Sequence, residues 1–434
     1  MRLRYLDLLR NRDFSLLLGG QTISRLGDGL QVAALLWLAL HLGGAGAVTL
    51  TAFAASAPRL ALGLFGGVYA DRLDRRRAMI FSDITRGLAV LLIPLFAATG
   101  SLAVWQLVLV AALLSAGGTL AEPARGALLA ALIRRDQLLP ANALSGATLQ
   151  ASYWLGPAML GLILQFAALK DVFSLDAATF GIAAVTDILI RYRGLADETA
   201  PHGGIIAEIG DSFSVARRDL LLWVPILVFT LGLLFAAGVR LVALPVLVGR
   251  TLHQSAGAFG LMLGAAGVGE MAGNVILGQF LIRAKGTAAA LGWALLGLFR
   301  APLGLIPNWR LGAGLLFGSG CVSALTDAPL ISLLQERTPE AKLGRVIGLV
   351  GTLAYGADAL AAPLIGGLLV IMPVAAVFLL CGLLTSGIGL VGAGVCWSRE
   401  KDGRAATPAP PEPAAETRLS PEAVEPAEGV PSAE

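Results

Sequence analysis

The sequence predicts an all-α membrane protein whose twelve transmembrane helices form two pseudo-symmetric six-helix bundles. Three observations predict this fold. The 434 residues are 56% hydrophobic and only 14% charged, whereas a soluble domain carries about 25% charged residues. The apolar residues fall in runs of about 20 or more, long enough to cross a hydrocarbon core of roughly 30 Å. The second half of the chain also echoes the first, at an offset of about 205 residues.

The apolar runs predict the twelve spans, with boundaries that can shift by a few residues. They fall at 14–41, 48–70, 79–99, 103–131, 140–168, 172–190, 220–249, 257–282, 287–306, 311–335, 345–371 and 373–397. If the N-terminus lies inside the cell, the cytoplasmic segments hold 23 Lys and Arg residues, and the outer loops hold three: Lys170, Arg250 and Arg310. The positive-inside rule therefore predicts that both termini are cytoplasmic.

The spans divide the chain into four regions. We expect an N-terminal bundle at 1–190, a cytoplasmic connection at 191–219, a C-terminal bundle at 220–397 and a cytoplasmic tail at 398–434. From residue 402 onward the tail holds seven prolines and a surplus of glutamate, with almost no large apolar side chains. Such a composition cannot bury enough surface to offset chain entropy, so the tail is expected to be disordered.

The two halves share a recognisable pattern. LAEPARGALLAAL around Glu122 corresponds to LTDAPLISLL around Asp327, and Gly67 corresponds to Gly278. Parallel six-helix repeats are typical of secondary transporters whose substrate site lies near the membrane midplane between the halves. A chance echo in Ala-, Leu- and Gly-rich sequence is the alternative for the repeat taken alone.

The stretch from Gly66 to Arg77, GGVYADRLDRRR, ends an apolar run with six charges in seven residues. Gly67 lies four residues before Asp71, and therefore one helical turn back on nearly the same face, where a missing side chain lets a neighbouring helix approach closely. A plain positive-inside loop would explain the arginines but not this spacing. Gly-x-x-x-Asp-Arg-x-x-Arg-Arg resembles the signature between the second and third helices of the major facilitator superfamily, although Asp74 stands where the family usually has glycine.

The resemblance implies a cytoplasmic gate that latches the two halves together in one of two alternating states. Its motif residues in this sequence are Gly67, Asp71, Arg72, Asp74, Arg75 and Arg76. We expect Asp83 and Arg86, at the start of the third span, to extend this gate. Asp71 is expected to face the start of the eleventh span near Arg345, where the helix dipole and the arginine both favour an anion.

Further stretches resemble one branch of the superfamily, the bacterial exporters that include the enterobactin exporter and macrolide efflux proteins. They are NRDFSLLLGGQTISRLGDGL, SDITRGLAVLLIP, PARGALLAALIRRDQLLPANAL, LDAATF and QERTPEAKLGRVIGL, within residues 8 to 397. The resemblance implies proton-driven export of siderophores, macrolides or other amphiphilic molecules. These motifs do not choose among such substrates.

Charged side chains at membrane depth are the candidates for chemistry, because each costs about 3 kcal/mol on insertion scales. In the family fold, spans 1, 4, 7 and 10 line the central cavity, and these spans carry Asp28, Glu122, Arg240 and Asp327. Arg25 lies three residues before Asp28 on the same face. An aspartate beside an arginine stays ionised while paired and can take up a proton once the two separate. Asp28, with Arg25, is therefore the first candidate for proton or substrate handling.

A purely structural role is the alternative for these residues. Arg25 with Asp28, and Glu122 with Arg125, would then be satisfied intrahelical pairs that only hold helices together. A gate salt bridge is the simpler role for Glu122, and Asp327 inherits this interpretation because it occupies the repeat-related position.

Glu270 and Asp358 lie near the middle of spans 8 and 11, with no cation close in sequence. Unpaired, they would be protonated and could carry protons; alternatively, each bonds a neighbour such as Arg300 or Arg59 on another helix. Asp176, toward the outer end of span 6, is interpreted as a hydrogen-bonded structural residue.

The sequence contains no enzyme, metal-site, cofactor or nucleic-acid-binding pattern. His41, His202 and His253 are far apart and outside the membrane core, the three cysteines lack ligand spacing, and no phosphate-binding loop is present. We expect a monomer in the bacterial inner membrane that interacts with lipid, protons and a small molecule. The leading hypothesis is a proton-coupled exporter of an amphiphilic compound; the alternatives are a facilitator or importer of a metabolite and a transport-inactive membrane sensor.

Overall fold

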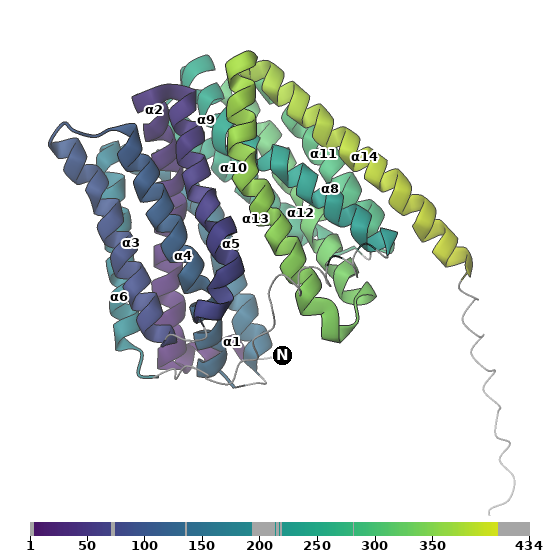
Figure 1. The fold of residues 1–434 in the computed structure, drawn as a ribbon, viewed down its shortest axis with the longest axis horizontal. Coiled ribbons are helices and arrows are strands. Elements are labelled where there is room, and N and C mark those ends of the chain that lie inside the picture. Colours follow the sequence, from purple (N-terminus) through teal and green to yellow (C-terminus); the bar gives the residue numbers. More distant parts are fainter. Residues whose placement is uncertain are drawn as a thin grey trace, which may run out of the picture.

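The computed structural model describes residues 4–70, 74–134, 137–192, 213, 217, 219–280 and 282–406. The first half contains α1 (Arg4–Arg10), α2 (Arg12–Ala70), α3 (Arg75–Ala98), α4 (Val104–Leu132), α5 (Leu138–Ile163) and α6 (Leu169–Leu189). The second half contains α8 (Leu220–Gly238), α9 (Leu244–Val246), α10 (Ala256–Leu277), α11 (Lys285–Arg300), α12 (Trp309–Arg337), α13 (Glu340–Ile371) and α14 (Val374–Ala406). Figure 1 shows the two halves side by side.

The twelve predicted spans are present. Ten helical segments of the described chain are long and apolar enough to cross a membrane. One of them, within α2, contributes two spans because the helix breaks at Gly43 and Gly44, where non-helical backbone turns the chain back. The Ala-, Gly- and Ser-rich α5 supplies the remaining span. Gly44 has φ of 68°, which favours glycine, and the guanidinium of Arg250 lies where a side chain at this position would be.

The seventh span is a composite helix. It begins as α8 and continues through a π-helix, η2 (Val239–Ala243), the short α9 and a second π-helix, η3 (Leu247–Thr251). The ninth span is also composite: it begins as α11 and ends in a 3-10 helix, η4 (Ala301–Leu305). π-Helical turns inside α-helices are rare and often occur at functional sites, and η2 carries Arg240.

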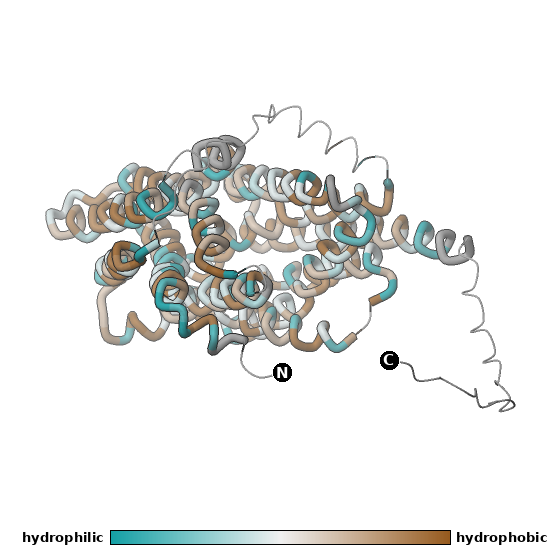
Figure 2. Tube along the Cα trace, turned by 90° about the horizontal axis from the view of Figure 1, so that it is seen from below, coloured by the Kyte–Doolittle hydropathy of each residue, from teal (hydrophilic) through white to brown (hydrophobic). Residues whose placement is uncertain are grey.

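The halves contact each other mainly through α5 with α10 and α2 with α13. We call the end of the molecule that carries α1 and the α2–α3 connection the basic end, because Arg10, Arg12, Arg75, Arg76, Arg77 and Arg191 lie there. Figure 2, which views the molecule from this end, shows hydrophobic residues in the helices of both halves, with hydrophilic residues among them. The opposite end carries the α2 break and the start of α10 (Figure 1).

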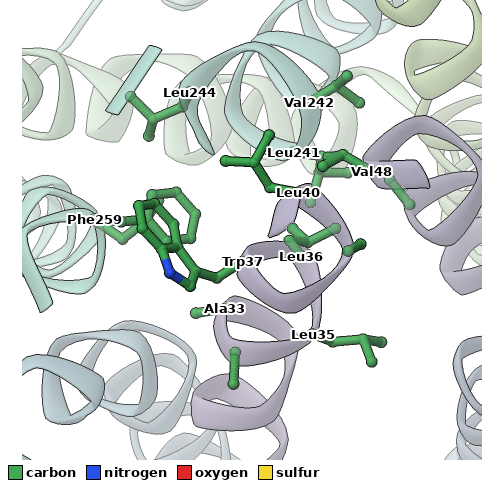
Figure 3. Packing of buried hydrophobic residues seen from close by; sticks show 14 of the residues in the cluster. Ala33, Leu35, Leu36, Trp37, Leu40, Val48, Leu241, Val242, Leu244 and Phe259 are labelled. Carbon is green, nitrogen blue, oxygen red and sulfur yellow. The ribbon is translucent and has the colours of Figure 1, made fainter. Parts of the chain in front are cut away.

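Among the described residues, the buried hydrophobic cluster that joins the two halves lies toward the opposite end. The largest buried cluster draws residues from both halves there, including Trp37 and Leu40 of α2, Leu247 of the seventh span and Phe259 of α10. Trp37 stacks on Phe259 with ring centroids 5.7 Å apart, as Figure 3 shows. Among the described residues, the clusters at the basic end belong to one half each. The described residues therefore close the molecule at the opposite end, and they form no shared hydrophobic cluster at the basic end.

The last span extends beyond its predicted end at Trp397. Helix α14 continues to Ala406, so the first residues of the predicted tail, 398–406, are helical and the expectation of a disordered tail from residue 398 was wrong at its start. Glu400 explains part of the extension: its carboxylate accepts hydrogen bonds from the Gly286 amide (2.8 Å) and the Thr287 hydroxyl (2.7 Å). The tail from 407 to 434 and most of the predicted connection at 191–219 lie outside the described residues.

Candidate functional site

The first charged site lies inside the N-terminal half and is centred on Asp28, near the middle of the first span. Arg86 of α3 donates to the Asp28 carboxylate at 2.5 Å. The Asp28 side chain is 31% exposed and that of Arg86 is 12% exposed. The guanidinium of Arg86 also lies 4.3 Å from the centre of the Phe180 ring of α6, and its stem packs beside Gly117 of α4.

Two sequence-based expectations about these residues need correction. Arg86 was expected to extend the gate, but it binds Asp28. Arg25 was expected to be the partner of Asp28, but Arg25 is only 8% exposed and its guanidinium contacts the Ser145 carbonyl of α5 at 3.5 Å. The physical reason is helix packing: α3 places a long side chain opposite Asp28, whereas Arg25, one turn away, points toward α5.

A second group of charges lies in the same half, closer to the basic end. Asp83 is 3% exposed and accepts from the Gln21 side chain at 3.4 Å. Asp187 of α6 is fully buried, and Arg76 donates to its backbone carbonyl at 2.8 Å. Arg125 of α4 bonds Glu122, as expected for an intrahelical pair. Asp83 therefore belongs to the interior of the N-terminal half in this structure.

The third site lies between the halves, where Gln150 of α5 donates to the Glu270 carboxylate of α10. Asp327 of α12 and Arg240 of η2 are within electrostatic reach of Glu270. The Arg240 guanidinium lies 5.6 Å from the centre of the Tyr153 ring, so two residues of α5 meet two charged residues of the C-terminal half. Asp327, at the position that the repeat relates to Glu122, therefore belongs to a group of polar side chains contributed by both halves.

Arg300 and Asp358 do not join this site through direct ion pairs. Arg300 donates to the Ser319 hydroxyl and the Ala236 carbonyl, both at 3.1 Å. Asp358 of α13 is half-buried, and no hydrogen bond or ion pair to it is present among the described residues. The sequence suggested Arg300 or Arg59 as a partner of Glu270 or Asp358. Neither arginine forms an ion pair with Glu270 or Asp358 in the part of the chain that the structure describes.

The gate motif is only partly covered by the structure. Asp71 and Arg72 lie outside the described residues, and of Gly67 only its place in the last turns of α2 is described. Asp74 caps α3 by accepting from the Arg77 amide at 3.0 Å, so Arg75 and Arg76 open a helix. Arg345 is exposed on α13 near the basic end. The latch between Asp71 and Arg345 therefore stays a prediction.

Two polar residues at these sites were not selected from the sequence. Gln150 carried no signal because an uncharged amide in a span is common. Asp176 was interpreted as structural, yet it is fully buried and its carboxylate lies against Gly27, the residue before Asp28. The LDAATF stretch contains Asp176, but nothing in this stretch indicates which helix the Asp176 carboxylate faces.

Two six-helix repeats with charged groups at membrane depth and a polar bridge between the halves define a secondary transporter of the major facilitator class. Comparison with known families narrows this class. The profile of the transmembrane secretion effector family matches residues 6–421, and the chain belongs to this family of the major facilitator superfamily.

Individual relatives agree with that placement. The chain is 30% identical to the enterobactin exporter EntS of Shigella flexneri over 346 residues, which cover 76% of this chain and 77% of the exporter. It is 25% identical to macrolide efflux protein A of Streptococcus pyogenes over 349 residues, or 77% and 84% of the two chains. Both relatives are named as exporters.

Solved structures show the same fold. The nucleoside transporter NupG superimposes with a TM-score of 0.68 at 12% identity, covering 88% of this chain and 99% of that one. A bacterial homologue of the lysosomal transporter Spinster, in an inward-facing and unoccupied conformation, gives 0.65 at 11% identity, covering 90% and 97%. At such identities the likeness shows the fold alone.

Proposed function

We propose that the protein is an inner-membrane exporter that moves an amphiphilic small molecule out of the cytoplasm in exchange for protons, by alternating access. The observation that carries the proposal is the ion pair between Asp28 and Arg86 at the middle of the first span. Charges at this depth are costly, and a partly exposed carboxylate paired with one arginine can exchange that partner for a proton or a substrate.

The orientation follows from charge. Among the described residues, the basic end carries most of the Lys and Arg residues outside the spans, and the positive-inside rule assigns such an end to the cytoplasm. The structure, closed at the opposite end by Trp37 and Phe259, then corresponds to a state that loads from the cytoplasm. In the alternate state, the gate motif would close the basic end, with Asp71 approaching α13 near Arg345.

The bridge between Gln150 and Glu270 supports coupling between the halves. It joins α5 to α10, one of the two main contacts across the interface. A hydrogen bond to a carboxylate is stronger than a neutral one, and its strength changes when the carboxylate takes up a proton. Protonation of Glu270 would therefore loosen a contact on which the relative position of the halves depends.

Efflux measurements in a host that lacks its own exporters test the function. Cells that express the protein should accumulate less erythromycin or ethidium than control cells, and a protonophore should abolish the difference. Asp28→Asn should remove this efflux at unchanged expression, whereas Asp171→Asn, which alters an exposed carboxylate in the first turn of α6, should not. Efflux by Asp28→Asn at the wild-type rate would exclude Asp28 from the mechanism.

A further inference from the structure

We propose that the exported molecule is a lipophilic cation that displaces Arg86 from Asp28, and that the displaced Arg86 pairs with Asp176, which then releases a proton. The inference rests on the proposed exporter function and adds the charge of the substrate and the residue that holds the exchanged proton. It assigns Asp176, at first interpreted as structural, to the coupling step.

Three side chains form a series from accessible to buried. Asp28 is 31% exposed, Arg86 is 12% exposed and Asp176 is fully buried. A carboxylate open to hydrocarbon at this depth would be unfavourable, so the exposed part of Asp28 faces space that water or a ligand can enter. A competing cation therefore reaches Asp28 first, and Asp176 can respond only through Arg86.

Two observations make Asp176 the second partner that we propose for Arg86. It lies one helical turn before Phe180, on the same face of α6, and the Phe180 ring contacts the Arg86 guanidinium. Its carboxyl group packs against Gly27, and it interacts electrostatically with both Asp28 and Arg86.

One atom of each prospective partner is unsatisfied. Oδ2 of Asp176 and Nε of Arg86 are buried without a hydrogen-bond partner among the described residues. Oδ1 of Asp176 has only the Thr179 hydroxyl at 3.3 Å, and that hydroxyl also lies 2.7 Å from the Asp176 carbonyl. Burying an ionised carboxylate with so little support costs far more than burying the neutral acid. Asp176 is therefore protonated while Arg86 stays with Asp28.

Other charges surround the three side chains but do not replace them. From α2, Arg25 lies on the α5 side of Asp28. From α3, Asp83 interacts with Arg86 and accepts from Gln21. From α4, Arg125 bonds Glu122 and adds positive charge near Asp28. Among these cations, only Arg86 interacts with both Asp28 and Asp176.

The carboxylates of the C-terminal half favour a cationic substrate. Asp327 is exposed, and Glu270 and Asp358 are half-buried. None of these three carboxylates forms an ion pair with a described residue. Of the arginines at this depth, Arg300 is engaged by Ser319 and a carbonyl, while Arg240 lies over Tyr153. Tyr153 is 43% exposed, and aromatic rings also attract cations.

The proposed exchange balances charge and protons. Before loading, the Asp28 carboxylate neutralises the Arg86 guanidinium, and Asp176 is a neutral acid. The cation binds the Asp28 carboxylate, Arg86 moves to Asp176, and the O–H bond of Asp176 breaks to release one proton to water. Each monovalent cation thus replaces one proton, and the buried region keeps its net charge. Release of the cation on the other side reverses the sequence, with Asp176 taking a proton from the outside.

Proton release by the purified protein tests the inference. Tetraphenylphosphonium is added to the protein in detergent and weak buffer, and protons are followed with a pH-indicator dye. The wild type should release about one proton per bound cation, so its affinity should rise about tenfold per pH unit wherever Asp176 is protonated in the free protein. Asp28→Asn should lose binding.

The decisive variant is Asp176→Asn, which mimics the neutral acid and should fold. It should still bind the cation, more weakly, with no proton release and no pH slope. Asp187→Asn is the matched control, because it removes another fully buried carboxylate from α6. It should keep both the proton release and the pH slope. Unchanged proton release in Asp176→Asn, an equal loss in Asp187→Asn, or absence of binding to the wild type would each overturn the inference.

The proposed function and the inference fail in different ways. If efflux collapses with a protonophore but Asp176→Asn still releases protons on binding, only the inference is wrong. If the purified protein exchanges the cation for a proton but efflux in cells ignores the protonophore, the inference stands for the binding step and the proposed proton-driven function is wrong.

Discussion

Truncation of Phe259 to alanine should shift the protein toward the state that is open at the opposite end. Phe259 is fully buried and stacks on Trp37 of the other half, with an interplanar angle of 23° (Figure 3). This contact exists only while that end is closed. Its loss therefore destabilises the closed arrangement and leaves the alternate arrangement, in which the two rings are apart, nearly unaffected.

The size of the shift can be estimated. A buried Phe→Ala change costs about 3–5 kcal/mol, and an aromatic pair adds about 0.5–1.5 kcal/mol. If about half of this total comes from contacts across the halves, the closed state loses about 2 kcal/mol, or roughly a 30-fold change in the ratio of the two states. Phe378→Ala is the matched control: Phe378 is 1% exposed but lies on α14, whose contacts are mainly within its own half.

Distances between spin labels report the shift. Labels at Lys170 of α6 and Arg310 of α12 lie on exposed positions at the opposite end, in a background where Cys321, Cys381 and Cys396 are replaced. Phe259→Ala should increase the population with the longer distance, whereas Phe378→Ala should lower thermal stability without changing the distribution. An unchanged distribution in Phe259→Ala would refute the claim that this contact closes the transporter.

Two further predictions concern packing. Gly161→Ala should destabilise the protein by about 1–3 kcal/mol, because the added carbon would lie 2.9 Å from the Gly257 carbonyl oxygen across the α5–α10 contact. Gly181→Ala is the control, because there is open space around Gly181. Thermal unfolding in detergent measures the stability of both variants. Glu400→Ala should cost about 1–3 kcal/mol by leaving the Gly286 amide without its carboxylate partner. Glu400→Ala should leave efflux intact. A melting temperature equal to that of the wild type would contradict the stabilising role of the hydrogen bond from Gly286 to Glu400.

The fold was predictable because bilayer thickness fixes the length of each apolar run. The predicted spans match the helices closely, including the end of α13 at Ile371. The π-helical turns around Arg240 were not predictable, since they depend on how the seventh span packs and not on its composition. The extension of α14 was missed because charged residues after Trp397 indicate the membrane edge, whereas the helix itself continues into water.

The charged site was predictable by residue type but not by partner. Membrane depth singled out Glu270, and depth together with the cavity-lining spans of the family fold singled out Asp28 and Asp327. Sequence spacing suggested Arg25 for Asp28, because a neighbour three residues away is the only one that periodicity can find. The actual partner, Arg86, is 58 residues away on α3, and such a pairing depends on the angle and register at which two helices pack.

The positions of the charges also separate the roles of the halves. The N-terminal half buries an ion pair, Asp28 with Arg86, whose arginine also interacts electrostatically with Asp176. In the exchange proposed above, this group keeps its net charge because a bound cation replaces the proton that leaves. Where the halves meet, the C-terminal half presents Asp327 and Glu270, with no ion-paired cation on either among the described residues, and a π-helical turn that carries Arg240. A ligand bound there would contact the C-terminal half through charge and the N-terminal half through Gln150 and Tyr153. Loading would therefore be sensed by both halves, which is what the proposed alternating-access mechanism needs.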